Sequence, residues 1–332
     1  MKTKIVYVLT SDDSDIYLEQ SYVSIYTLRK HNPDAYVVLI VDADTDKTIV
    51  GNRNYILSVI TEKVVIPAPC GYTKVEISRY LKNTIRQNID GDLLYIDSDT
   101  VITDRLDDID YVEADVCGVL DNHVTLDEHP KFHTLFQRQA KYVDWKIQPS
   151  DYHYFNGGVL FVKDNNVGRE LFRRWNEEWE KGRKRGLHSD QPSLGKVNAE
   201  LGYVIKELDG AWNCQIADNG MRYFDKAKII HYFSSTIINY ETEYAFLLMN
   251  ESFFYPLKKY GKLDTKSEMM LASPKELFNS KVKLVCGINL SIYNSPLFYR
   301  LYVIYVRHPK IYNFLNRCCT RYEIYLNKRK RC

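Results

Sequence analysis

Short apolar runs alternate with longer amphipathic stretches along the first two thirds of the chain. A continuous apolar, β-branched run at 5–9 predicts a buried strand, and largely apolar stretches predict further strands at 35–41, 61–66, 93–96, 116–120, 154–162 and 228–233. Helical spacing of apolar residues predicts helices over 16–30, from near Thr48, over 76–88 and over 170–181. Strand and helix therefore alternate as in βαβ units, which predicts an open, mostly parallel sheet whose ligands bind beyond the carboxyl ends of the strands.

Composition agrees with a folded protein that has a sizeable core. Of the 332 residues, 45% are hydrophobic and 27% are charged, and 45 Lys and Arg nearly balance 43 Asp and Glu. This balance gives no argument for nucleic-acid binding. Seven cysteines, without a C-x-x-C pair, argue against a zinc site or a disulfide framework and favour a reducing compartment. With no signal-peptide pattern and no apolar stretch of membrane-spanning length, the sequence predicts a cytoplasmic protein.

Two carboxylates follow one of the predicted strands. Leu93–Ile96 ends in Asp97-Ser98-Asp99, and alternation along an extended chain puts Asp97 and Asp99 on one face. A hard divalent cation such as Mn²⁺ or Mg²⁺ relieves their repulsion, which indicates a metal-diphosphate site. The alternative is a strand that runs into an Asp-rich turn, with Asp99 capping the segment that follows.

Further polar residues lie near other predicted strands. Gly157 and Gly158 allow close approach of the backbone to a ligand or a strand, and Asn156 beside them offers a donor and an acceptor. A helix-start signal at His188–Pro192 contains a carboxylate and an amide. His231 interrupts an apolar strand, and a lone histidine in such a setting is usually a satisfied core residue.

Taken together, these features resemble the family 8 retaining glycosyltransferases, the group that contains bacterial lipopolysaccharide galactosyl- and glucosyltransferases and glycogenin. The resemblance covers about residues 3–240 and rests on five segments in the same order, which are Val8–Asp12, Arg79, Leu94–Asp99, Phe155–Val159 and Ser189–Gln191. His231, in Ile230-His231-Tyr232, matches the family's third protein ligand to manganese, which reverses its interpretation as a core residue. The resemblance implies an α/β, GT-A-like fold: a single Rossmann-type nucleotide-sugar-binding domain with a mixed, mostly parallel sheet, followed by a C-terminal helical extension.

The same resemblance implies a role for each matched residue. Donor binding is assigned to Leu9, Thr10, Ser11, Arg79, Asp97, Ser98, Asn156, Gly157 and Gly158, metal binding to Asp97, Asp99 and His231, and catalysis to Asp190 and Gln191. The implied reaction is a metal-dependent transfer of glucose, galactose or an N-acetyl relative from a UDP-sugar to a glycan or lipid-linked acceptor, with retention of configuration. We favour attack by the acceptor on the face that UDP leaves, because Gln191 is a poor nucleophile; a covalent intermediate on Asp190 is the rival mechanism.

One segment departs from the family pattern. After the His-Tyr pair many members continue with a glycine and, three residues later, a lysine that binds the diphosphate, whereas this chain continues Phe233-Ser234-Ser235-Thr236-Ile237. Either the hydroxyls of Ser234 and Ser235 hold the phosphates together with the metal, or another cation such as Arg79 substitutes. The missing lysine also motivates an alternative function, a catalytically inactive nucleotide-sugar-binding scaffold of a polysaccharide-assembly complex.

The pattern changes after residue 240. We expect a catalytic domain over 1–240 and a helical region rich in aromatic and basic residues over 241–332. Within that region, Pro296–Cys332 suits either an amphipathic helix on the inner, anionic face of a membrane or a basic helix packed on the catalytic domain. The cytoplasmic character and the basic tail favour bacterial surface-glycan synthesis, of lipopolysaccharide or capsule. The polar segment Asp121–Ser150 is longer than a plain loop and is either a helical excursion or an acceptor lid.

Overall fold

A seven-stranded β-sheet forms the centre of the fold, with the strand order β3-β2-β1-β4-β7-β6-β8, and a second sheet has the order β5-β10-β9. The computed structural model describes residues 1–130, 132, 137–147, 153–232, 245–278, 291–293 and 295–329. Within these ranges the strands are β1 (Lys4–Leu9), β2 (Val37–Asp42), β3 (Glu62–Ile66), β4 (Leu93–Ile96), β5 (Thr100–Ile102), β6 (Val116–Leu120), β7 (Phe155–Val162), β8 (Ile205–Glu207), β9 (Cys214–Gln215) and β10 (Ile229–His231).

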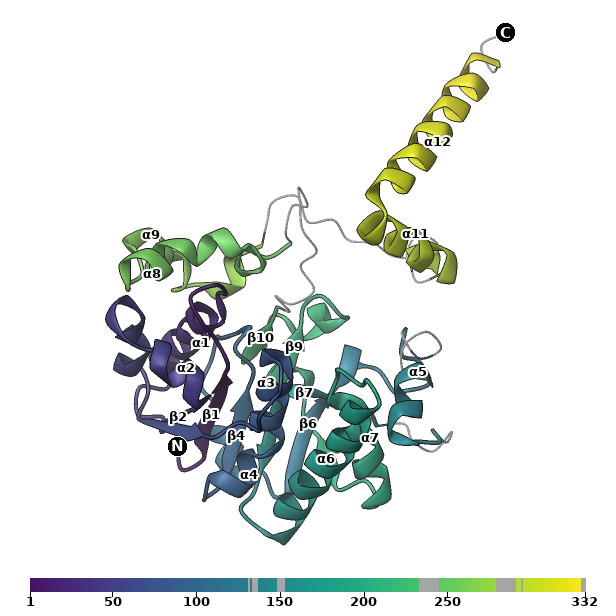
Figure 1. Cartoon of the computed structure of the whole chain (residues 1–332). Coiled ribbons are helices and arrows are strands. Elements are labelled where there is room, and N and C mark those ends of the chain that lie inside the picture. Colours follow the sequence, from purple (N-terminus) through teal and green to yellow (C-terminus); the bar gives the residue numbers. More distant parts are fainter. Residues whose placement is uncertain are drawn as a thin grey trace. The chain divides into compact units, whose positions relative to one another are not determined.

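Helices pack against both faces of the large sheet (Figure 1). The α-helices of the described ranges are α1 (Tyr17–His31), α2 (Ala43–Thr48), α3 (Lys74–Asn83), α4 (Ile85–Asn88), α5 (Gln137–Ala140), α6 (Asn166–Lys184), α7 (Gln191–Glu200), α8 (Tyr255–Tyr260), α9 (Thr265–Met270), α11 (Pro296–Arg307) and α12 (Pro309–Arg329). Val6 and Tyr95 enter a core that also contains side chains of α3, α4, α6 and α7. Tyr7 and Leu94 enter the opposite core, with side chains of α1 and the small sheet. Adjacent residues of β1 and β4 thus fill separate cores, as expected for strands that are buried on both faces.

The direction of β7 makes the large sheet mixed. β7 runs antiparallel to both neighbours, β4 and β6, whereas β1 pairs in parallel with β2 and β4. In the β4–β7 ladder Ile96 lies opposite Val159, and the N–H of Asp97 donates to the carbonyl oxygen of Gly158 at 2.8 Å. The amino end of β7 therefore lies against the carboxyl end of β4, and Gly158 lies beside Asp97, the first of the two carboxylates that follow β4.

The small sheet places a histidine beside the second carboxylate. After Asp99 the chain enters β5, which pairs antiparallel with β10 so that Thr100 lies opposite His231. The N–H of Tyr232 donates to the carbonyl oxygen of Asp99 at 3.1 Å. Strand pairing thus brings Asp99 and His231, which are distant in the sequence, to the same edge of the fold.

The predicted α/β fold with a mixed, mostly parallel sheet is confirmed. The seven predicted strands are present in the described ranges, with ends that shift by a few residues, and β5, β8 and β9 are additional short strands. One helix prediction is wrong, and a second is right in its extent but not in its continuity. The helix expected to begin near Thr48 begins earlier, at Ala43, because the Asp42 carboxylate caps its first turn, and it ends at Thr48. The helix expected over 76–88 is divided at Thr84 into α3 and α4.

The chain divides into two compact units. The first comprises Met1–Ile237 and Tyr244–Asn279, and the second comprises Ile238–Glu243 and Ser280–Cys332. This grouping differs from the expected division at residue 240, because α8 and α9 belong to the first unit. Leu257 and Leu271 of that segment are buried in the same core as α1, and this apolar contact attaches the segment to the first unit.

The second unit, taken by itself, contributes α11 and α12 in its described part. These helices expose the apolar side chains of Leu297, Tyr299, Tyr302, Ile311 and Phe314. They also expose the basic side chains of Arg300, Arg307, Lys310, Arg317 and Arg321. The C-terminal helical extension implied by the resemblance is therefore present. Among the described residues, none of the helices is both long enough and apolar enough to cross a bilayer.

Candidate functional site

Three side chains with metal-binding chemistry meet at the ends of β4 and β10. One potential ligand atom from each of Asp97, Asp99 and His231 lies within 4.8 Å of the others. His231 is buried, and the two carboxylates are partly buried. Carboxylate and imidazole groups together form a ligand set that Mn²⁺ accepts. The structure thus brings the three predicted metal ligands together, and their chemistry fits a divalent cation.

A buried chain of hydrogen bonds fixes the orientation of His231. A carboxylate can only accept hydrogen bonds, so the group of Asn156 that lies 2.8 Å from Oδ1 of Asp121 is its Nδ2 donor. Oδ1 of Asn156 accepts from Nδ2 of Asn213 at 3.0 Å, and Oδ1 of Asn213 faces Nδ1 of His231 at 3.0 Å. Nδ1 therefore carries a hydrogen, which leaves Nε2, 3.1 Å from Oδ1 of Asp99, as the ligand atom.

The proton on His231 depends on the neighbouring carboxylate. Burial lowers the pKa of His231, but the carboxylates of Asp99 and Asp97 together raise it by more, so the pKa lies above the ordinary value for histidine. Histidine binds a metal as neutral imidazole, with no proton on the coordinating nitrogen. A divalent cation and a proton therefore compete for Nε2 at this site.

The two glycines of β7 make room for charged side chains. A Cβ atom on Gly158 would lie 2.5 Å from Cε1 of His231 and 2.7 Å from Oδ2 of Asp97. A Cβ atom on Gly157 would lie 3.2 Å from Nζ of Lys82. The sequence predicts that a ligand or a strand approaches these glycines closely. In the structure, side chains of the site approach them instead.

Asp190 immediately precedes α7, and its carboxylate lies near two cations of α3. An aspartate at this position commonly caps the helix with its side chain, but here it makes no cap hydrogen bond. Instead, Oδ1 lies 3.5 Å from Nε of Arg79, and Oδ2 lies 3.8 Å from Nζ of Lys82. The Asp190 carboxylate raises the pKa of Arg79. Within the described chain, Oδ2 of Asp190 and Nε of Arg79 are buried atoms that have no hydrogen-bond partner, which is uncommon for buried polar groups.

A pocket of about 190 Å³ adjoins these groups. The predicted donor-binding residues that line it are Leu9, Thr10, Arg79, Asp97 and Ser98. Gln20 of α1 also lines the pocket, and its buried amide has no hydrogen-bond partner among the residues described. Gln191, the residue after Asp190, is half-buried at the start of α7.

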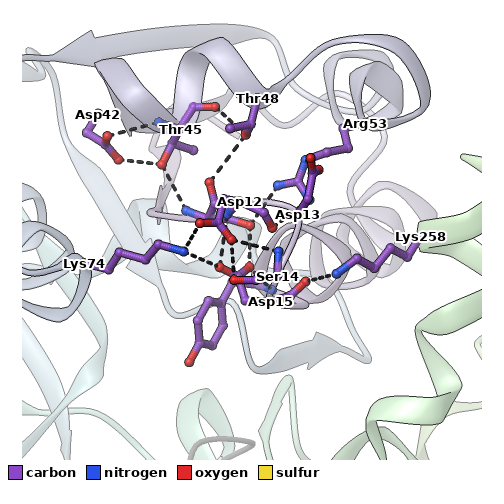
Figure 2. Close-up of polar contacts among 12 residues, drawn as sticks. Asp12, Asp13, Ser14, Asp15, Asp42, Thr45, Thr48, Arg53, Lys74 and Lys258 are labelled. Carbon is purple, nitrogen blue, oxygen red and sulfur yellow. Dashed lines mark hydrogen bonds and ion pairs between the residues drawn. The ribbon is translucent and has the colours of Figure 1, made fainter.

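Ser11 does not line this pocket. Its N–H donates to Oγ1 of Thr45 at 3.0 Å, and its hydroxyl donates to Oδ1 of Asp15 at 2.6 Å. Figure 2 shows two lysines at the same acidic turn: Nζ of Lys258 donates to the carbonyl oxygen of Asp15 at 2.5 Å, and Nζ of Lys74 lies 3.5 Å from its Oδ2. Ser11 therefore anchors the turn after β1.

Several residues that shape the site are absent from the sequence prediction. The hydroxyl of Tyr95 donates to Oδ1 of Asp97, and burial together with that carboxylate raises the pKa of Tyr95 well above its ordinary value, so the hydroxyl stays protonated. Nζ of Lys82 lies 3.6 Å from the same oxygen. The position of Asp121 after a strand, like that of Asp97, is a signal that sequence analysis can use. For Asn213 there is no local signal.

Some predictions fall on residues that are not described. Ser234 and Ser235, the first candidates to replace the missing lysine, lie outside the described residues. The segment expected as a helical excursion or an acceptor lid is described in part, and that part contains the short helix α5.

Several solved structures of glycosyltransferases have a similar fold. The galactosyltransferase LgtC, in complex with donor and acceptor sugar analogues, has a TM-score of 0.51 and 15% sequence identity over 80% of this chain and 99% of that chain. The bifunctional glycosyltransferase WbbM has a TM-score of 0.53 and 14% identity over 82% of this chain and 51% of that chain. At these identities the likeness concerns the fold, which is the GT-A fold of such enzymes.

Comparison of the sequence with family models identifies the family as well as the fold. It matches the model of glycosyl transferase family 8 over residues 6–236, and the chain belongs to this family. No curated protein matches it significantly. The resemblance stated from the motifs is thus confirmed, and the protein is a glycosyltransferase.

Proposed function

We propose that this glycosyltransferase is a metal-dependent, retaining hexosyltransferase that uses a UDP-sugar. The sugar is glucose, galactose or an N-acetyl relative, and the acceptor is a glycan or a lipid-linked glycan of bacterial surface-polysaccharide synthesis. The observation that carries the proposal is the Asp97–Asp99–His231 group, two members of which line the pocket beside Arg79. Family membership supports a nucleotide-sugar donor and a glycan acceptor.

The residues of the metal group would hold the donor diphosphate indirectly. Mn²⁺ or Mg²⁺, when bound there, neutralises the charge that develops on departing UDP. Tyr95 keeps one oxygen of Asp97 occupied, so the carboxylate is held in a fixed orientation. We assign Leu9, Thr10 and Ser98, which line the pocket, to the uridine part of the donor.

The sugar would lie near Asp190. Its Oδ2 and Nε of Arg79 are buried polar atoms without a hydrogen-bond partner in the described chain, and a small movement of these side chains would let sugar hydroxyls supply the missing hydrogen bonds. Asn156 already makes three hydrogen bonds within the protein, so contact with the sugar would use the remaining hydrogen of its amide. Gln191 would lie near the reacting carbon, and the acceptor would attack on the face that UDP leaves.

The competing function is a scaffold that binds a nucleotide sugar without transferring it. Its motivation is the missing lysine after Tyr232. Against it stands the metal group, in which all three ligand residues are present and close together. Release of UDP from a UDP-sugar, even by slow hydrolysis, would exclude the scaffold.

Thermal unfolding tests the metal-diphosphate site directly. We expect the melting temperature of the wild type to rise by about 3 °C or more with Mn²⁺ and UDP together, and by less with either alone, because each ligand completes the binding site of the other. In Asp97→Ala the joint shift should disappear. The absence of any shift in the wild type would contradict the proposal and favour an ordinary acidic turn at Asp97 and Asp99.

We further propose that α11 and α12 bind an anionic membrane surface on which the acceptor is anchored. Their exposed apolar and basic side chains together support this. The full chain should sediment with vesicles that contain anionic lipid and not with neutral vesicles, and a chain that ends at Asn294 should lose this binding. Equal sedimentation of the two chains would contradict the role of these helices and favour a solvated basic extension.

A further inference from the structure

Lys82 is a buried cation beside the metal group to which the sequence motifs give no role. Its side chain is 6% exposed, and its Nζ lies 3.6 Å from Oδ1 of Asp97 and 3.8 Å from Oδ2 of Asp190. The ring centroid of Tyr95 is 5.0 Å from the same nitrogen. A lysine with so little contact with water needs compensating charge. Here one compensating carboxylate belongs to the metal group and the other lies in the proposed sugar site.

Lys82 also makes the surroundings of the two Asp97 carboxylate oxygens different. Oδ1 lies near Nζ of Lys82 and accepts the hydroxyl hydrogen of Tyr95. Oδ2 lies on the side of His231, since the same Cβ atom on Gly158 would contact both Oδ2 and the imidazole ring. The ammonium group therefore occupies the side of Asp97 away from His231, which leaves Oδ2 for the metal.

We propose that Lys82 is a positioning residue that couples the binding of the divalent cation to the binding of the donor diphosphate. This inference rests on the proposed function. A fixed positive charge beside Asp97 weakens the attraction of the empty site for a divalent cation. The same charge strengthens the attraction of the metal-loaded site for a diphosphate. One ammonium group thus has opposite effects on the two binding steps.

Replacement of Lys82 by a neutral residue tests this coupling. In Lys82→Gln, calorimetric titration should give Mn²⁺ binding to the free protein that is about 5-fold tighter than in wild type, because a nearby like charge is removed. UDP should bind the Mn²⁺-saturated variant about 5-fold more weakly. A loss of structure would weaken both steps, so the opposite signs are specific to the electrostatic role.

Lys196→Gln is the matched control. Lys196 is also largely buried, and it pairs with Glu178 at 2.6 Å and with Glu200 at 3.0 Å. Both dissociation constants should stay at wild-type values in this variant. Lys82→Met serves as the second neutral variant if Lys82→Gln does not fold.

The outcomes separate this inference from the proposed function. The role of Lys82 would be overturned if a folded Lys82 variant had wild-type dissociation constants for Mn²⁺ and UDP, or if both constants changed in the same direction. The metal-diphosphate site would still stand in that case. A wild type that binds neither Mn²⁺ nor UDP would overturn the proposed function, and this inference with it.

Discussion

Gly158→Ala should abolish the joint binding of Mn²⁺ and UDP in a chain that still folds. The added Cβ would lie 2.5 Å from Cε1 of His231 and 2.7 Å from Oδ2 of Asp97, so at least one of these groups must move. His231 is held by Asn213 and by the backbone pairing of β10, and it has little freedom to turn. Since metal sites tolerate ligand shifts of only a few tenths of an ångström, Mn²⁺ affinity should fall at least about 100-fold.

Gly157→Ala is the matched control for this result. Its Cβ would lie 3.2 Å from Nζ of Lys82, the end of a flexible side chain that can yield by a small amount. Calorimetric titration of Gly157→Ala with Mn²⁺ should therefore give a dissociation constant much closer to that of wild type than Gly158→Ala gives. If Gly158→Ala bound Mn²⁺ as tightly as wild type, Asp97 and His231 would not be joint ligands of one cation.

The longer strands of the large sheet are predictable because each contains an apolar run. All six residues of β2, for example, are buried, and so are all eight of β7. The short strands β5, β8 and β9 carry no such signal, since two or three residues form a strand only when distant partners are already in place. The reversed direction of β7, which brings Gly158 to Asp97, is likewise a property of the assembled sheet.

The site is predictable to a smaller extent. Alternation within an extended segment is enough to place Asp97 and Asp99 on one face, and the structure brings both to the metal group. His231 is 2% exposed in an apolar strand, so its surroundings are those of a core residue, and its pairing with Asp99 follows from the meeting of β5 and β10. The roles of Lys82 and Asn213 could not be predicted from the neighbouring sequence, because the residues that they contact lie elsewhere along the chain.

One helix supplies much of the positive charge of the site. Thr73 and Glu76 form a capping box that fixes the start of α3. Arg79 and Lys82 follow at a spacing of one turn, so both reach Asp190 from the same side. The chain lacks the lysine expected after Tyr232, and the positive charge found in the described part of the site comes instead from α3.

Asp190→Asn should lower kcat/KM for the UDP-sugar by about 100-fold or more. Hydrogen bonds to a charged group contribute about 1.5–3 kcal/mol each, and the amide provides a weaker acceptor to the sugar. The change also removes the ion-pair partner of Arg79 and one of the two carboxylates beside Lys82, which keeps Asp97, and this loss reduces stability. Asp164→Asn, at a carboxylate that accepts from Arg169 at 2.9 Å outside the site, is the control for loss of an ion pair.

The same variant separates the two mechanisms for retention. If Asp190 binds the sugar, Asp190→Asn should retain the thermal shift given by Mn²⁺ and UDP but lose the additional shift given by a UDP-sugar. If Asp190 instead forms a covalent intermediate, the UDP-sugar should still bind while turnover is lost, because the nucleophile acts only after binding. We expect the first result, since the carboxylate lies between Arg79 and Lys82, whose positive charges hold it in place beside the pocket-lining Arg79. Near-wild-type activity would exclude both roles.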